Sequence, residues 1–160
     1  MKTGLLAAAL MSLMALAIGA PAGNAKWTED PASRCRFVAP KSLTAGPTFW
    51  VGDCPNGKAS GLGMLRRRDG DHVGPAFYGK MQEGVPQLGV IDDDEGYRVG
   101  AFHDGDIGTD RELEPQVRLD AFRVATDAAR QVSATYRAEN NPASGKFYED
   151  VATMLDQQIE

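Results

Sequence analysis

The chain is poor in the residues from which most catalytic and metal sites are built. Its 160 residues include two cysteines and two histidines, and neither type forms a Cys-x-x-Cys or His-x-x-x-His pair. Such spacings are typical of redox-active disulfides and zinc sites. The Gly-x-Ser-x-Gly turn of serine hydrolases is also missing, and Gly61-x-Gly63 lacks the third glycine of a dinucleotide-binding motif. We therefore predict no catalytic residues, no metal ligands and no cofactor.

Long apolar runs are equally scarce, and the one candidate lies at the start of the chain. Lys2 precedes a stretch from Gly4 to Ile18 that is apolar or small, and small residues follow up to Gly23-Asn24-Ala25. A positive charge, an apolar run and a small-residue exit, in that order, are typical of a cleavable secretory signal peptide. We predict cleavage after Ala25, with Ala20 as the alternative site.

The predicted signal peptide, residues 1–25, sets the expected localisation. Its apolar run is shorter than the roughly 20 residues that span a bilayer, and no later run reaches that length. The sequence therefore predicts no transmembrane span, with an uncleaved N-terminal anchor as the alternative. No cysteine lies near the cleavage point, so no lipid anchor is expected. We expect a periplasmic or secreted protein whose residues 26–160 form a single domain.

The charge of the chain bears on its partners. Residues 1–25 hold one lysine and no acid, so their removal takes the net charge from −5 to −6. Nucleic acids and anionic membranes attract positive surfaces. The sequence thus favours another protein or an envelope component as partner and disfavours nucleic acid, and it leaves the oligomeric state open.

The two cysteines, Cys35 and Cys54, both lie in the part that would be exported to an oxidising compartment. With only two, they pair with each other if they pair at all. Closing this loop would stabilise the domain by about 3 kcal/mol in the chain-entropy model. The alternative is a redox-active or nucleophilic cysteine, which no neighbouring histidine supports.

The chain changes character near residue 113. Residues 26–108 are rich in glycine, with short apolar or aromatic runs between turn signals such as Asn56-Gly57 and Asp69-Gly70. Residues 113–160 keep only Gly145 and are rich in helix formers. We predict an α+β fold: an antiparallel sheet of stacked β-hairpins over 26–108, followed by a C-terminal helical hairpin over 113–160.

Two apolar stripes define the predicted helices. Pro115 suits the first turn of one helix, and Asn140-Asn141-Pro142 predicts its end. Asn141 or Ser144 would cap the second helix. We expect both stripes to be core and to pack against one face of the sheet. The first stripe consists of Val117, Ala121, Val124, Ala125, Ala128, Val132 and Tyr136, and the second of Phe147, Val151, Met154, Leu155 and Ile159.

A motif recurs three times in the glycine-rich half: an aromatic residue precedes a glycine, and a second glycine follows five positions later. Such a unit is expected to form one hairpin, with the glycines in turns and close backbone contacts. The copies comprise Trp50, Gly52, Gly57, Gly61 and Gly63, then Tyr78, Gly79, Gly84 and Gly89, then Tyr97, Gly100, Gly105 and Gly108.

The first copy resembles a MORN repeat. Trp50-x-Gly52, Asn56-Gly57-Lys58 and Gly61-x-Gly63 match that pattern in order, and the resemblance covers about residues 48–108. It looks like the exported bacterial type, in which a cysteine such as Cys54 replaces an aromatic residue. The resemblance implies a stacked-hairpin sheet and a scaffolding or interaction role, which some members direct at membrane lipids.

Two charged regions offer alternatives. Asp92–Glu95 together with His103–Asp106 could form a cation site or a small active centre, although Asp104-x-Asp106-x-Gly108 lacks further ligands of a calcium loop. The favoured interpretation is two acidic surface turns. Alternation places Arg66 and Arg68 of the basic run on one face and Arg67 on the other. We interpret that run as a solvated hairpin end, with binding of anionic ligands as the alternative, and Trp50 as core rather than a carbohydrate platform.

The leading hypothesis is therefore a noncatalytic exported binding or scaffold module with MORN-like repeats. One alternative is an inhibitor or immunity protein against a secreted hydrolase, because such proteins are small, disulfide-closed and often acidic. The other is a small cation-binding protein or enzyme that uses Asp92–Glu95 and His103–Asp106. The Cys35–Cys54 bridge is expected to pin an otherwise unpaired N-terminal segment to the first hairpin and to cap one end of the sheet.

Overall fold

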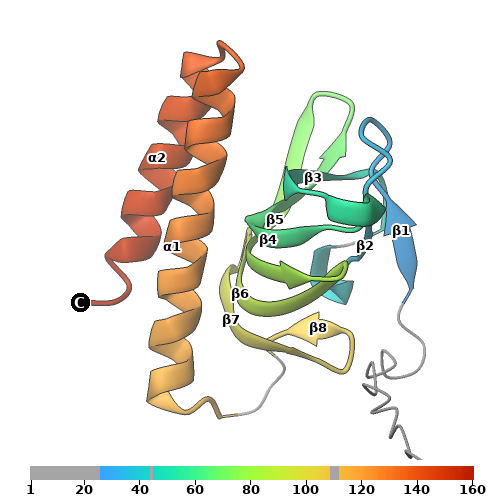
Figure 1. Cartoon of the computed structure of the whole chain (residues 1–160). Helices are drawn as coiled ribbons and strands as arrows, with labels where there is room; N and C mark the ends of the chain where they lie inside the picture. The colour runs from blue at the N-terminus through green and yellow to red at the C-terminus, as the bar shows by residue number, and fades with distance from the viewer. Residues whose placement is uncertain (1–25, 44, 109–111) are drawn as a thin grey trace, which may run out of the picture.

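The structure is a computed structural model that describes residues 26–43, 45–108 and 112–160. The predicted signal peptide and its cleavage site lie outside the described residues. Figure 1 shows a twisted sheet with two long helices on one side and the N-terminal strands on the other.

Six strands form one antiparallel sheet in chain order, and two further strands pair ahead of it. This confirms the predicted α+β fold with hairpins followed by a helical hairpin. The sheet strands are β3 (Thr48–Asp53), β4 (Ser60–Asp69), β5 (His72–Gln82), β6 (Val85–Asp93), β7 (Gly96–His103) and β8 (Asp106–Ile107). The remaining elements are β1 (Trp27–Glu29), β2 (Arg36–Val38), two 3-10 turns, η1 (Lys41–Leu43) and η2 (Pro55–Gly57), and helices α1 (Pro115–Ala138) and α2 (Pro142–Asp156).

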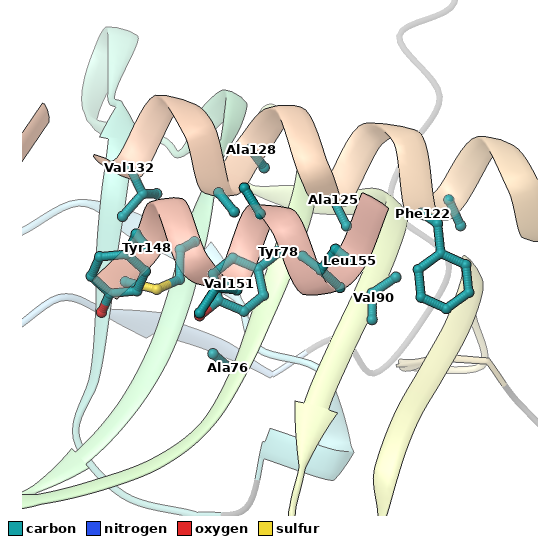
Figure 2. Packing of buried hydrophobic residues seen from close by; sticks show 14 of the residues in the cluster. Ala76, Tyr78, Val90, Phe122, Ala125, Ala128, Val132, Tyr148, Val151 and Leu155 are labelled. Atoms are coloured by element: carbon teal, nitrogen blue, oxygen red, sulfur yellow. The ribbon is translucent and has the colours of Figure 1, made fainter. Parts of the chain in front are cut away.

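Side chains alternate between two cores because successive residues of a strand point to opposite faces. Tyr78 and Val90 belong to a core shared with the helices, whereas their neighbours Phe77 and Ile91 belong to a second core. We call the first side of the sheet the helix face and the second the lid face. Figure 2 shows the helix-face core, with Ala125 and Val132 of α1 above Tyr78 and Val90.

The lid face is covered by the N-terminal segment, which differs from the prediction. Residues 27–38 form their own hairpin, β1–β2, rather than an unpaired segment. Phe37 and Leu43 are fully buried against the lid face, so the segment covers a face of the sheet and not its end. The predicted disulfide is present: Cys35, just before β2, bonds to Cys54, just after β3, with their Cα atoms 6.1 Å apart.

A buried carboxylate also fastens this segment. Asp30 is almost fully buried, and its Oδ2 accepts a hydrogen bond of 2.8 Å from the backbone N–H of Trp50 on β3. Its Oδ1 accepts hydrogen bonds from the backbone N–H groups of Ala32 and Ser33 at 2.7 and 3.0 Å. Asp30 therefore closes the turn after β1 and satisfies a donor on the free edge of β3.

Five glycines stand directly opposite one another across five neighbouring strands. They pair in the order Gly52, Gly63, Gly79, Gly89 and Gly100. The ring of Trp50 lies over the first two, and the ring of Phe77 over the next two: a Cβ on Gly63 or Gly79 would approach those rings to 2.5 and 2.4 Å. The row of glycines therefore lets two large rings lie against the backbone of the lid face.

The repeat motif divides its glycines between two roles. The first glycine of each copy, at 52, 79 and 100, lies in this row. The second, at 57, 84 and 105, lies in a turn at φ between 73° and 85°, where L side chains are strained. Asn56 and Gly57 have the positive φ angles that their sequence predicts, but in a longer connection between β3 and β4 than a two-residue turn.

The aromatic residues of the three copies do not share one face. Trp50 lies on the lid face, whereas Tyr78 and Tyr97 contact the helix-face core. The spacing explains this, because Trp50 precedes its glycine by two residues and Tyr78 precedes Gly79 by one. Phe77 is the structural counterpart of Trp50.

Helix α1 packs against the sheet as predicted, whereas α2 packs mainly against α1 rather than directly on the sheet (Figure 1). Asn141 caps α2 by accepting a hydrogen bond from the backbone N–H of Ser144. The predicted stripe of α2 is partly wrong, since Phe147 and Met154 are 51% and 46% exposed. The buried face is centred on Tyr148, one residue from Phe147, and continues through Val151, Ala152 and Leu155.

In the described part of the chain, no helix has the length and hydropathy to span a membrane.

The row of glycines predicts that a Gly→Ala substitution lowers the free energy of unfolding by an amount that depends on its position. Gly79→Ala places a Cβ against the Phe77 ring and the Leu88 carbonyl, and we expect a loss of about 3 kcal/mol from overpacking. Gly57→Ala meets no neighbouring atom and should cost about 1–2 kcal/mol through its positive φ alone. Urea unfolding of both variants tests this, and equal losses would contradict the proposed role of the row.

The disulfide predicts a separate effect on the lid. Cys35→Ser should lower the melting temperature by about 10 °C, because the closed loop of 19 residues contributes about 3 kcal/mol. Hydrogen exchange should speed up first in β1 and β2, which the bridge ties to β3. The double variant Cys35→Ser/Cys54→Ser controls for an unpaired thiol. An unchanged melting temperature would rule out a stabilising bridge.

Candidate functional site

The clearest concentration of unusual side chains lies on the helix face around Arg66 of β4. Within the basic run, Arg67 lies on the lid face, where its Nε donates to the Ala45 carbonyl, and Arg68 is exposed. Arg66 is only 6% exposed, so the interpretation of the whole run as a solvated hairpin end is wrong for this residue. Its face was predicted correctly, because Met64 and Arg66 alternate with Leu65.

Aromatic rings surround the Arg66 guanidinium. Its Nη2 donates a hydrogen bond of 2.5 Å to the Tyr78 hydroxyl. The guanidinium carbon lies 5.5 Å from the ring centre of Tyr148, 5.9 Å from that of Phe147 and 6.0 Å from that of Tyr78. Such distances allow attraction between the cation and the π faces of the rings.

The rings also contact one another, which holds the start of α2 to the end of α1. Tyr136 of α1 stacks on Tyr148 of α2, with their ring centres 5.3 Å apart and their planes 7° from parallel. Phe147 meets Tyr148 edge to face at 5.0 Å. In Figure 2, Tyr148 and Tyr78 lie side by side where α2 approaches the sheet, with their ring centres 6.4 Å apart.

The positive charge of Arg66 lacks a carboxylate partner within the described residues. Apart from Tyr78, it reaches the Gly74 carbonyl through Nη1 at 3.4 Å, and its buried Nε makes no hydrogen bond. Burial raises the pKa of the Tyr78 hydroxyl, more than the nearby positive charge of Arg66 lowers it, so Tyr78 stays neutral. The site is a desolvated cation held by neutral groups, so its positive charge is available to attract an anion.

Asp92 is the nearest acid on the same row of the sheet, two strands away. The cross-strand pairs Arg66–Ala76 and Ala76–Asp92 place Ala76 between them. Burial raises the pKa of the Asp92 carboxyl above its ordinary value, and the Arg66 charge offsets only part of this rise. Asp92 is therefore poorly compensated as an anion.

The surroundings of Arg66 open to the surface through apolar side chains. Phe147 is 51% exposed, and Val73, the cross-strand partner of Arg68, is 58% exposed. Tyr136 is half-buried, and its hydroxyl interacts electrostatically with the positive charge of Arg68 and the negative charge of Glu139. We call the surface formed by Arg66, Arg68, Val73, Tyr136, Phe147 and Tyr148 the Arg66 face.

The two acidic turns do not form one site. Asp92–Glu95 and His103–Asp106 lie at opposite ends of β7 (Gly96–His103), a strand that spans roughly 23 Å. The acids serve local contacts: Asp93 pairs with Arg98 at 3.6 Å, and Asp106 accepts a hydrogen bond from Ser42. Among the described residues, no group of three or more His, Cys, Asp or Glu side chains could hold a metal ion.

The sequence pointed only in part to the Arg66 face. The helical spacing predicts Tyr136 on the apolar stripe of the first helix, but it also predicts Phe147 in the core and leaves Tyr148 out. The spacing of Tyr148, Val151, Ala152 and Leu155 fits one helical face, but the predicted set does so too, and spacing alone does not choose between them. The chain matches no family model, no curated protein and no solved structure.

The raised pKa of Asp92 predicts how stability depends on pH. A carboxyl whose pKa is higher in the folded than in the unfolded protein stabilises the fold only while protonated, so ionisation at neutral pH lowers stability. Asp92→Asn should therefore raise the melting temperature at pH 7 and have little effect below about pH 3.9, the ordinary Asp value. Asp71→Asn, exposed in the turn between β4 and β5, is the matched control, because Asp71 does not act on the pKa of Asp92. If Asp92→Asn raised the melting temperature more at pH 3 than at pH 7, the predicted direction of the pH dependence would be wrong.

Proposed function

We propose that this chain is a noncatalytic binding module that works outside the cytoplasm, in the periplasm or as a secreted protein. The signal-like residues 1–25 support export, and the Cys35–Cys54 disulfide fits an oxidising compartment. MORN-like repeats are part of the proposal. The row of glycines and the recurring turns at Gly57, Gly84 and Gly105 are consistent with a repeated hairpin unit.

The observation that carries the proposal is the pairing of a buried, carboxylate-free arginine with a half-exposed phenylalanine. Phe147 lies over Arg66 and exposes half its surface, so a partner would meet the ring first and the charge behind it. Aromatic and arginine side chains at a partly desolvated position are the residues that contribute most to protein interfaces. The proposed partner is a segment of another exported protein that presents an apolar side chain next to a carboxylate.

Site-specific photo-crosslinking in cells that export the full chain tests this proposal. A benzophenone amino acid at position 147 should form a crosslink to a protein partner, because the side chain at this position lies over Arg66 and is half exposed. The same group at position 154 is the matched control, since Met154 is similarly exposed on α2 but lies two turns away. The crosslinked peptide of the partner should contain an Asp or Glu within a few residues of an apolar side chain.

A second variant separates binding from folding. Arg66→Met keeps a long apolar side chain, and replacing a buried charge in this way is commonly neutral or stabilising. We expect an unchanged or higher melting temperature together with a loss of at least about fivefold in crosslink yield at position 147. Equal yields at 147 and 154, or a yield that survives Arg66→Met, would overturn the proposed binding face. If the crosslinked partner is a hydrolase, and an equimolar amount of this protein inhibits its activity, the module is an inhibitor.

A further inference from the structure

A pocket on the opposite side of the molecule carries a second inference. It lies where the start of β1, the η1 turn and the entry to β3 meet, and its volume is about 340 Å³. The residues that line it include Lys26, Thr28, Lys41, Ala45, Gly46 and Thr48. These described residues include two lysines and no carboxylate, in a chain whose net charge is −5.

The two lysines reach the pocket from different elements. Lys26 directly precedes β1, and Lys41 begins η1. The Lys41 backbone N–H donates to the Gly105 carbonyl at 3.0 Å, and its Nζ donates to the Asp104 carbonyl at 2.6 Å. These bonds hold the ammonium at the turn between β7 and β8, at the margin of the pocket. An ammonium has three donors, so two remain for a ligand. The Thr28 hydroxyl, beside Lys26, makes no hydrogen bond to the described residues and supplies a further donor.

A third cation stands behind the pocket wall. The Arg67 guanidinium covers Gly46, where a Cβ would approach its carbon atom to 1.9 Å. Its Nε donates to the Ala45 carbonyl at 2.9 Å. Asp69 lies 3.4 Å from Nη2 and balances part of this charge. Arg67 therefore fixes the Ala45–Gly46 wall and adds positive potential to it.

The predicted cleavage site gives Lys26 a second positively charged group besides its side chain. Cleavage after Ala25 leaves Lys26 as the first residue, so its α-amino group becomes a free ammonium within the same residue that lines the pocket. Such a group has an ordinary pKa near 7.7–8.0 and is largely protonated at neutral pH. Maturation would thus add a third ammonium to a pocket that already holds two.

We propose that this pocket binds a small multivalent anion, and that removal of residues 1–25 completes it. This inference rests on the proposed export and on cleavage after Ala25. Lysine ammonium groups act as point charges toward phosphate and carboxylate oxygens, and several converging on one pocket favour an anion with two or more negative charges. The ligand class is a compact phosphate-bearing or dicarboxylate molecule.

Titration calorimetry on the exported, processed protein tests the pocket, with pyrophosphate and succinate as probes at constant ionic strength. Binding of both probes indicates a general dianion site, and binding of pyrophosphate alone indicates a site for phosphate groups. Lys26→Gln and Lys41→Gln should each weaken binding about fivefold, the effect of one charge at about 4 Å in water. Lys80→Gln, an exposed lysine on β5, should leave binding unchanged.

A variant that keeps every side chain isolates the amino terminus. Insertion of Gly-Ser-Gly-Ser between the cleavage site and Lys26 moves the α-amino group out of the pocket, and we expect about fivefold weaker binding with no change in melting temperature. N-terminal sequencing of the processed protein separates the two hypotheses. A first residue other than Lys26 would refute the predicted cleavage and the inference built on it. A first residue of Lys26, with equal binding by all variants or none by the processed protein, would refute the anion pocket and leave export standing.

Discussion

The close approach of the Trp50 and Phe77 rings to a row of glycines is the contact on which the rest of the structure depends. Each ring lies over two neighbouring strands at a distance that a Cβ atom would prevent. Because two side chains cover so much backbone, the lid face needs few further residues. The hairpin β1–β2 and the η1 turn, anchored by Phe37 and Leu43, are enough to close it. The disulfide and Asp30 then fasten a covering that is itself short.

The helix face is packed differently. Its strands carry side chains such as Met64, Tyr78 and Val90, which stand off the sheet and meet α1 and α2. Since α1 lies along the sheet and α2 mainly along α1, the start of α2 reaches the sheet through aromatic side chains rather than through close backbone packing. Arg66 lies in that wider space, held by Tyr78 and the rings of α2. A cation can be buried there because the rings and one hydroxyl partly replace its water.

Features encoded by neighbouring residues could be predicted from the sequence, whereas features that depend on distant packing could not. Gly70 and Asn56-Gly57 adopt turn conformations, and Asn141 caps its helix, because these preferences act over two to four residues. The Cys35–Cys54 pairing followed from having only two cysteines. The lid was missed because β1 and β2 are three residues each, too short for periodicity to reveal. Phe147 was misplaced because its spacing fits either of two adjacent helix stripes, and only the partner helix decides between them.

The two proposed sites lie back to back because consecutive residues of one strand serve them. Arg66 points to the helix face and Arg67 to the lid face, where it holds the wall of the anion pocket. Coupling between two sites requires an element with two arrangements that both ligands bias. The strand between them is fixed on both sides, by β3 and β5 along its edges and by separate cores above and below. The sheet therefore separates the sites as well as supporting them, and occupancy of the pocket should leave the affinity of the Arg66 face unchanged.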